Sequence, residues 1–284
     1  MLGLSASVLA FSHARLHSIA ACTNWLQMTS IGSIDMERSN ALPDSIRAAI
    51  EAHGGAARWA ELAEIEATVS ACGLLFTAKR RPILRQVQVR ASTHEPRFAF
   101  NDFPHVGETS ELQGEELVRV VGRDGAILAR RDGPRTAFRG WRRQIYWDDL
   151  DFVYFGAYAF WNYLTAPFLF LRGGFTFKEL PPLATSAGIW PRIRATFPSD
   201  IPTHSRVQDF YFDRQHRLCR IDYTAMVIGR WARAAHICED FREFDGFLVP
   251  TRRTVKPLPV GNAPLPAPTL VAIEVHDFRP RPSD

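Results

Sequence analysis

Apolar and polar residues alternate along most of this 284-residue chain, in the pattern typical of amphipathic β-strands. Between Ile65 and Ala71 every second residue is apolar, and similar segments recur as far as Phe278. Gly, Pro and Asp-Gly turn signals separate the segments, which favours antiparallel strands joined by short connections. We expect strands near 65–71, 83–90, 95–101, 107–112, 116–122, 126–131, 175–180, 189–197, 206–212, 218–228, 233–241, 247–256 and 270–278.

Helical periodicity replaces this alternation at two places. Near the N-terminus, Asp44 is a suitable cap for a helix that ends at Gly54-Gly55, and a short second helix is expected at 56–62. Between Phe152 and Leu171 the chain has twenty residues without a charge. Aspartates precede this run, where a helix dipole favours negative charge, and Pro167 is expected to end a helix of four to five turns.

The uncharged run must lie in a bilayer, in a protein core or beside a ligand. Its length is enough for a membrane span, but Gly156, Asn162 and Pro167 interrupt it and strands lie on both sides, so we predict no transmembrane segment. A helix that is apolar all round must be covered on most of its surface.

The two faces of this helix are expected to differ. Phe152, Phe155, Ala159 and Tyr163 form a face that is suited to packing on the sheet. Tyr154, Tyr158, Trp161 and Thr165 form a face with polar groups on aromatic rings, which suits a ligand cavity. A plain core helix is the alternative. These features predict an α+β fold, with a large curved antiparallel sheet, N-terminal helices and an inserted aromatic-rich helix.

Charge and motifs exclude several classes of protein. The formal net charge is +4, but the basic residues are dispersed among acids, so we expect no nucleic-acid partner. The four cysteines form no CxxC pair and the histidines have no ligand spacing, so we predict no metal and no cofactor. The usual catalytic signatures GxSxG, HExxH and GxGxxG are also missing.

The polar residues of the C-terminal strands are the candidates for a site. Arg220 and Asp222 share one face of their strand, and His236 and Arg252 follow on the next two strands. They form either cross-strand ion pairs or a site for the polar end of a ligand, in which His236 and Asp222 could also do acid–base work. His204 is the other candidate base, with a loop histidine bonded to backbone as the alternative.

Several stretches of the chain are similar to an uncharacterised bacterial family related to the LolA/LolB-like half-barrel. They are WDDLDFVYFGAYAFWNYLTAPF, FPSDIPTHSRVQDFYFD, RIDYTAMVIG, ARAAHICEDFREFDG and VPTRRTV, within Ala48–Phe278. The order of sheet and helices resembles the same fold, which is that of outer-membrane lipoprotein carriers. The resemblance implies an open barrel that wraps around helices and leaves an apolar cavity for acyl chains.

These observations lead to a prediction of function with an alternative. We expect a soluble protein whose half-barrel encloses an apolar or amphipathic, lipid-like molecule, with Tyr154, Tyr158 and Trp161 on its body and Arg220, Arg252 or His236 on its polar end. A cofactor-independent enzyme acting on a hydrophobic molecule in the same cavity is the alternative, with His204, His236 and Asp222 as candidate catalytic residues. A third reading is a peripheral membrane protein whose helix inserts in the interface.

The N-terminal segment differs from the rest of the chain. Residues 1–35 lack a basic region before their apolar start, and a sequence typical of soluble proteins follows Met36. We expect 1–35 to be a disordered extension or an over-called start, 36–284 to be a single half-barrel domain, and the protein to be cytoplasmic. A signal peptide or lipoprotein anchor within 1–22 is the less favoured alternative. The sequence predicts no oligomeric state.

Overall fold

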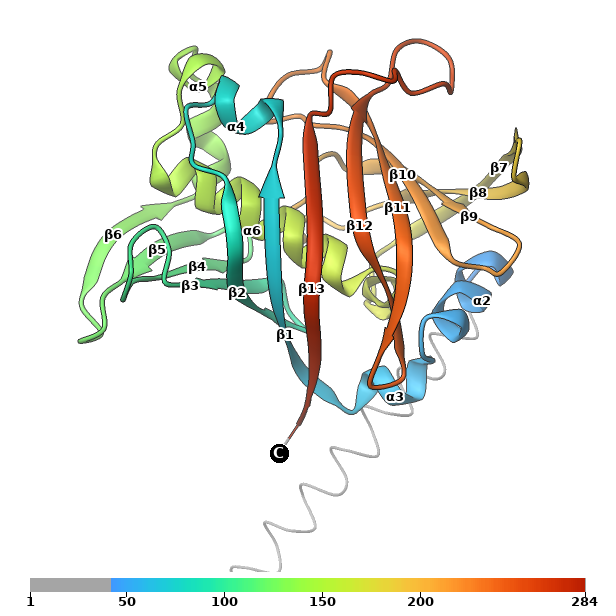
Figure 1. The fold of residues 1–284 in the computed structure, drawn as a ribbon, viewed down its shortest axis with the longest axis horizontal. Coiled ribbons are helices and arrows are strands. Elements are labelled where there is room, and N and C mark those ends of the chain that lie inside the picture. The colour runs from blue at the N-terminus through green and yellow to red at the C-terminus, as the bar shows by residue number, and fades with distance from the viewer. Residues whose placement is uncertain (1–41, 284) are drawn as a thin grey trace, which may run out of the picture.

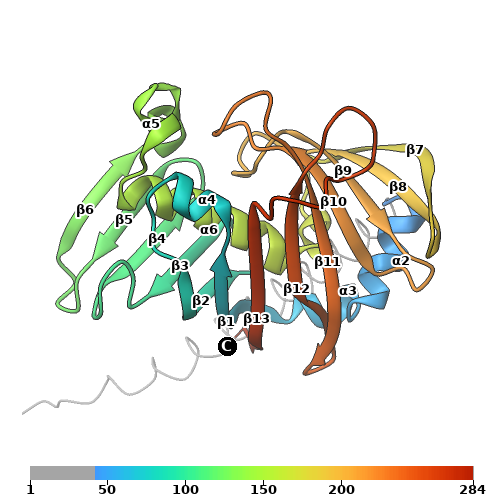
Figure 2. The same cartoon turned by 45° about the horizontal axis from the view of Figure 1, so that its top comes forward.

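A single antiparallel sheet of thirteen strands dominates the computed structural model, which describes residues 42–283. The sheet curves around one long helix and its two edges do not meet (Figures 1 and 2). The strand order is β6-β5-β4-β3-β2-β1-β13-β12-β11-β10-β9-β8-β7, so the last strand lies beside the first in the middle of the sheet. The prediction of an α+β open half-barrel with an inserted helix is confirmed.

The strands have the following bounds: β1 Leu62–Cys72, β2 Leu84–Ser92, β3 Arg97–Asn101, β4 Thr109–Gln113, β5 Leu117–Val121, β6 Ile127–Asp132, β7 Thr176–Thr185, β8 Gly188–Thr196, β9 Val207–Phe212, β10 Leu218–Thr224, β11 Arg233–Phe244, β12 Phe247–Pro257 and β13 Val271–Pro282. Each expected strand has a counterpart. The segment expected at 218–228 ends at Thr224, because a turn follows it before β11 begins.

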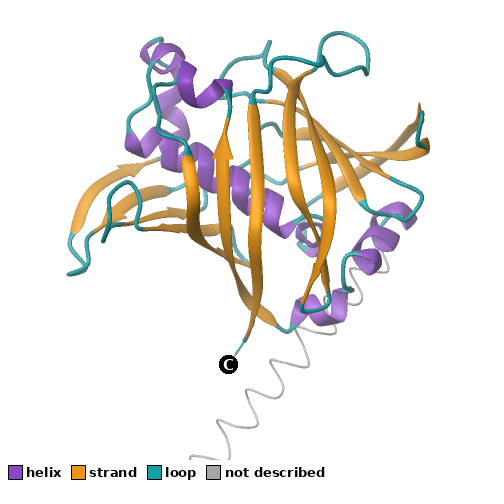
Figure 3. Ribbon diagram, in the orientation of Figure 1, coloured by secondary structure: helices purple, strands orange, loops and turns teal. Residues whose placement is uncertain are grey.

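The longest helix crosses the inside of the curved sheet, and the shorter helices lie towards the upper left and lower right of the view (Figure 3). Their bounds are α2 Asp44–Ala52, α3 Ala56–Ala60, α4 Leu74–Ala78, α5 Arg142–Ile145 and α6 Asp149–Thr165, with short 3₁₀ helices η1 Pro134–Arg139 and η2 Phe168–Leu171. Two expectations near the N-terminus were wrong. Pro43 takes the capping position of α2, and Asp44 is the first helical residue. Helix α3 ends at Ala60, and Leu62 already belongs to β1.

Helix α6 lies inside the curve of the sheet and packs against β2–β6 and η1. It begins with a capping box in which the Asp148 side chain accepts from the Asp151 backbone and the Asp151 side chain accepts from the Asp148 backbone. It ends at Thr165, two residues before Pro167, as expected. Between residues 42 and 283 we find no helix with the length and apolar character needed to span a bilayer.

Candidate functional site

A cavity of about 520 Å³ lies between α6 and the strands in the middle of the sheet. Its size falls within the usual range for small-molecule sites. Aliphatic residues of the wall come from five strands: Ala71 of β1, Leu84 of β2, Ala234 of β11, Val255 of β12, and Val271 and Ile273 of β13. Helix α4 and the two loops 225–232 and 258–265 line it at one end of the barrel. The wall is therefore mostly apolar and is built from segments that are distant in the sequence.

The face of α6 that lines this cavity is the reverse of the one that we expected. Phe152, Phe155, Ala159 and Tyr163 line the cavity, together with the neighbouring Gly156 and Phe160. The rings of Tyr154, Tyr158 and Trp161 are fully buried and are not part of the wall. The amphipathic rings are thus used to pack α6 in its place, and the purely apolar rings adjoin the cavity.

Hydrogen bonds explain why the polar rings face the protein. The Tyr154 hydroxyl donates to Glu115 Oε2 at 2.7 Å and accepts from Arg135 at 3.1 Å. The indole of Trp161 donates to the backbone oxygen of Ser92 at 2.9 Å. A buried polar group needs such a partner, and the surrounding strands and loops offer several. These two expected ligand contacts therefore already have protein partners.

One end of the cavity, which we call the inner end, is formed by Tyr163, His204 and Tyr223. The Tyr163 hydroxyl lies 2.6 Å from His204 Nε2 and 3.0 Å from the Tyr223 hydroxyl. The Tyr158 hydroxyl lies 3.2 Å from His204 Nδ1, and the His204 ring stacks on Tyr223 with centroids 4.1 Å apart. The inner end is a connected polar group in an otherwise apolar wall.

The imidazole of His204 is neutral at physiological pH. Burial, with the nearby charge of Arg135, lowers its pKa to about 3. A neutral imidazole has one donor and one acceptor nitrogen, so it matches two tyrosine hydroxyls, one on each side. The structure thus places His204 in a hydrogen-bonded network, and its role as a catalytic base stays a prediction.

Arg220 and Asp222 lie on the outer face of the sheet, away from the cavity. Arg220 Nε donates to Asp222 Oδ1 at 2.7 Å, and the Tyr211 hydroxyl donates to Asp222 Oδ2 at 2.8 Å. His236 is paired in register with Ile221, so it points to the face opposite Asp222. The sheet separates the imidazole from the carboxylate, and the proposed acid–base pair of His236 and Asp222 does not form.

Arg252 also lies on the outer face. Its side chain is 52% exposed and forms ion pairs with Asp240 at 3.0 Å and Glu239 at 3.4 Å. This is the cross-strand ion pairing that was the structural alternative for these polar residues. Neither Arg220 nor Arg252 contributes to the cavity wall.

Arg253, one residue further along β12, points inward and is 1% exposed. Its guanidinium donates to the Tyr163 backbone oxygen at 2.6 Å and lies 3.4 Å from the Cys238 sulfur. The sequence analysis missed this residue. Arg253 is an even number of residues from the buried Phe247, Val249 and Val255 of β12. It therefore lies on the same face as they do, which is the inner face of the sheet.

The other end of the cavity, which we call the mouth, carries exposed apolar residues. Trp231 is 78% exposed, and Leu74 and Leu265 are about half-exposed, although all three line the cavity. Lys79 lies here too, and its ammonium group donates to the backbone oxygens of Arg143, at 3.0 Å, and Gln144. Burial lowers the pKa of Lys79. The mouth thus combines apolar side chains with basic ones.

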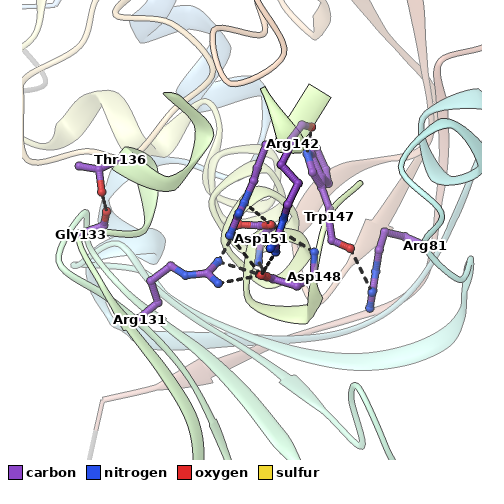
Figure 4. Close-up of polar contacts among 9 residues, drawn as sticks. Arg81, Arg131, Gly133, Thr136, Arg142, Trp147, Asp148 and Asp151 are labelled. Atoms are coloured by element: carbon purple, nitrogen blue, oxygen red, sulfur yellow. Dashed lines mark hydrogen bonds and ion pairs between the residues drawn. The ribbon is translucent and has the colours of Figure 1, made fainter. Parts of the chain in front are cut away.

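Ion pairs fix the start of α6 near this mouth (Figure 4). Asp151 is fully buried and pairs with Arg131 at 2.6 Å and with Arg143 at 2.8 Å. Asp148 pairs with the same Arg131 at 2.8 Å. Burial, together with the adjacent charge of Asp148, raises the pKa of Asp151. This cluster anchors the N-terminus of α6 to helix α5 and to the end of β6.

A second depression, of about 700 Å³, begins at Ser205 beside the inner end and includes Arg135, Arg139 and Arg206. This depression lacks the enclosing apolar strands of the first cavity. We therefore take the first cavity as the candidate site. Among residues 42–283, no group of three or more His, Cys, Asp or Glu side chains is arranged to hold a metal ion.

Comparisons with known proteins give likenesses of fold alone. No family model matches the chain, and no curated protein matches it. A LolA superfamily protein from Nitrosomonas europaea is 12% identical, with a TM-score of 0.46 over 78% of this chain and 86% of that one. A putative outer membrane lipoprotein-sorting protein domain from Vibrio parahaemolyticus is 9% identical, with a TM-score of 0.47 over 89% and 93%. A DUF1329 family protein from Desulfovibrio piger is 12% identical, with a TM-score of 0.45 over 83% and 91%.

Proposed function

We propose that this protein binds an apolar or amphipathic small molecule, such as a lipid, in the cavity between α6 and the sheet. The observation that carries the proposal is the cavity itself, about 520 Å³ of space with an apolar wall and a polar inner end. Small-molecule sites in proteins combine these two features, because the apolar wall supplies affinity and a few polar groups supply orientation.

The size of the hydrophobic contribution is consistent with binding. Each buried methylene group contributes about 0.8 kcal/mol, so a chain of about twelve methylenes contributes about 10 kcal/mol. Association costs about 4 kcal/mol or more, which leaves at most about 6 kcal/mol, a dissociation constant of tens of micromolar. A ligand with a long alkyl chain or fused rings satisfies this requirement, and a small polar metabolite does not.

Mass spectrometry of the intact protein tests the proposal most directly. The protein purified from a bacterial host is measured under native conditions, before and after extraction with organic solvent. We expect a bound apolar compound that the solvent removes. A purified protein that carries no such compound and binds no fluorescent lipid probe contradicts the proposal.

A cavity-filling variant locates the binding site. Ala234 lines the cavity from β11, and Ala234→Phe places a ring in that space. Ala272 of β13 precedes the inward-facing Ile273 and points to the outer face, so Ala272→Phe is the matched control. We expect the first variant to lose most of its probe binding and the second to bind as the wild type does. Equal binding by both variants places the ligand elsewhere.

A further inference from the structure

We propose that the ligand carries an anionic head group, such as a carboxylate, which lies at the inner end of the cavity next to Arg253. This inference rests on the proposed function and specifies the class of ligand. Four observations support it: the charges of the cavity wall, the lack of a counter-ion for Arg253, the open hydrogen-bonding capacity of His236, and the position of both residues behind the inner end.

The charged residues of the cavity wall are all basic. Lys79, Arg81 and Arg233 line the cavity, and no Asp or Glu of the described chain does. Asp149 pairs with Arg81, but no carboxylate of the described residues pairs with Lys79 or Arg233, so the net charge at the cavity is positive. A cationic ligand is disfavoured in this field and an anionic one is attracted.

Arg253 is a buried cation without a carboxylate partner among the described residues. Within residues 42–283, no carboxylate lies within ion-pair distance of its guanidinium, and its Nε has no hydrogen-bond partner. Its bonds go to a backbone oxygen and a thiol, and its charge lies 5.6 Å from the Tyr163 ring centroid. A buried charge without a counter-ion is strongly unfavourable, so the site favours a molecule that supplies the missing negative charge.

His236 lies next to this cation and has unused hydrogen-bonding capacity. It is fully buried, and neither ring nitrogen has a partner among the residues that the structure describes. Its ring meets Tyr163 edge to face, with centroids 4.2 Å apart. Buried polar atoms without partners are rare in native proteins, and a ligand atom is one way to satisfy them.

Both residues are next to the inner end of the cavity. Val255 faces His236 across the β11–β12 pair, and Ile273 faces Arg253 across the β12–β13 pair; both of these neighbours line the cavity. Tyr163 contacts both polar residues and also forms part of the inner end. A head group that contacts Tyr163 is therefore attracted by the positive charge of Arg253, and tyrosine hydroxyl groups donate hydrogen bonds to the head group.

The basic residues at the mouth are already bonded. Arg81 pairs with Asp149, the Lys79 ammonium donates to two backbone oxygens, and Arg233 donates to the Pro259 backbone oxygen at 3.3 Å. Of these four cations, Arg253 alone combines a buried guanidinium, no carboxylate partner among the described residues and an Nε without a hydrogen bond. This difference favours a ligand that enters head first and leaves its apolar tail towards the mouth.

The test compares two fluorescent probes with the same tail, cis-parinaric acid and the corresponding alcohol. Binding of each is titrated with the wild type, with Arg253→Met, with Arg253→Lys and with Arg252→Met, in which the neighbouring arginine of the outer face is replaced. We expect the wild type to prefer the acid about tenfold or more, since a hydrogen-bonded charge pair supplies such a factor. The preference should be lost in Arg253→Met, partly kept in Arg253→Lys and unchanged in Arg252→Met.

Each result distinguishes this inference from the proposed function. Equal binding of acid and alcohol by the wild type overturns the inference and leaves the proposed function standing, and this comparison needs no variant to fold. Arg233→Met, which removes a cation at the mouth, is titrated with the same two probes. If the preference for the acid disappears in Arg233→Met and persists in Arg253→Met, the head group lies at the mouth, and the inference is overturned. Failure of both probes to bind the folded wild type contradicts the proposed function itself.

Discussion

Acidification from pH 7 to pH 5 should strongly destabilise this protein, because it buries three neutral histidines. His53, His204 and His236 are each at most 2% exposed. Burial lowers the pKa of His53 to about 4 and that of His204 to about 3, and it lowers the pKa of His236 well below its ordinary value. In the unfolded chain the same side chains titrate near pH 6.5.

The sign of the effect follows from proton binding. Between pH 6.5 and about pH 4 the unfolded state binds protons that the folded state does not, so the free energy of unfolding decreases as the pH decreases. At pH 5, His53 and His204 each contribute about 2 kcal/mol, so the two together contribute about 4 kcal/mol, and His236 adds to this loss. That loss is comparable to the whole stability of many domains. Asp151, whose pKa is raised, acts in the opposite direction at the acidic end of this window.

His53 provides the variant that isolates one of the three contributions. Its Nδ1 lies 2.7 Å from the Leu248 backbone oxygen, and its Nε2 accepts from the Leu218 backbone at 3.1 Å, so it serves as a neutral bridge between strands. Urea unfolding at pH 7, 6 and 5 gives the free energy of unfolding at each pH. The slope of the free energy of unfolding against pH gives the number of protons taken up on unfolding. Near pH 5.5 we expect between two and three protons for the wild type, and about one proton less for His53→Gln.

The control is His94→Gln, because the His94 side chain is exposed to solvent. It should leave the slope unchanged. A wild-type slope of about one proton or less, in a protein that is folded at both ends of the range, refutes the reasoning. Such a slope means that the buried imidazoles accept protons in the folded state, for instance through an unrecognised carboxylate or water channel.

Three further predictions concern the packing of α6 and the thiols. Asp151→Asn should lower the free energy of unfolding by about 2–4 kcal/mol in urea titrations, because it leaves Arg131 and Arg143 without their fully buried partner. Asp149 is about half-exposed in its pair with Arg81, so Asp149→Asn should cost less, about 1 kcal/mol, and equal losses in the two variants contradict this. Trp161→Phe should lower the free energy of unfolding by about 1–3 kcal/mol by the same measurement, since it leaves the Ser92 backbone oxygen without its donor. An unchanged urea midpoint contradicts this, because it means that another donor satisfies the Ser92 oxygen. In thiol labelling of the native protein followed by peptide mapping, exposed Cys72 should react before buried Cys219 and Cys238, whose pKa values burial raises, and early labelling of Cys238 contradicts the buried position.

The strands and the helices α2, α3 and α6 could be predicted from the sequence, and the short helices α4 and α5 could not. Alternation of apolar and polar residues marks a half-buried strand directly, and each expected strand has a counterpart. Helices α4 and α5 have only five and four residues, so they are too short to show a helical period. They are held by contacts with distant segments, such as the bonds from Leu74 and Leu75 to 269–270, which the local sequence does not contain.

The site could be predicted only in part, for two physical reasons. A helix that is apolar all round gives no preferred direction, so the pattern of α6 could not show which face adjoins the cavity. On β12 the difference between Arg252 and Arg253 is one residue, and one residue reverses the face of the sheet. The apolar alternation on this strand was sufficient to choose Arg253. For α6, only the three-dimensional arrangement could decide.

The cavity arises because α6 fits one half of the sheet closely and the other half less closely. It packs against β2–β6 through Phe152, Gly156 and Phe160, and the aromatic rings of β3 occupy the space there. Opposite the central strands, the wall includes several small residues, such as Ala71, Ala159 and Ala234.

Larger side chains at these small positions would fill the space and stabilise the fold. Unfilled apolar volume costs about 24 cal/mol per Å³, so even a quarter of this cavity corresponds to about 3 kcal/mol. Proteins that gain nothing from such a space have a simple route to greater stability through larger residues. The alanines in the wall therefore favour ligand binding over incomplete packing as the reason for the cavity. Ala234→Phe, compared with Ala272→Phe, tests this directly. Filling the cavity should weaken probe binding and raise the free energy of unfolding in the same variant.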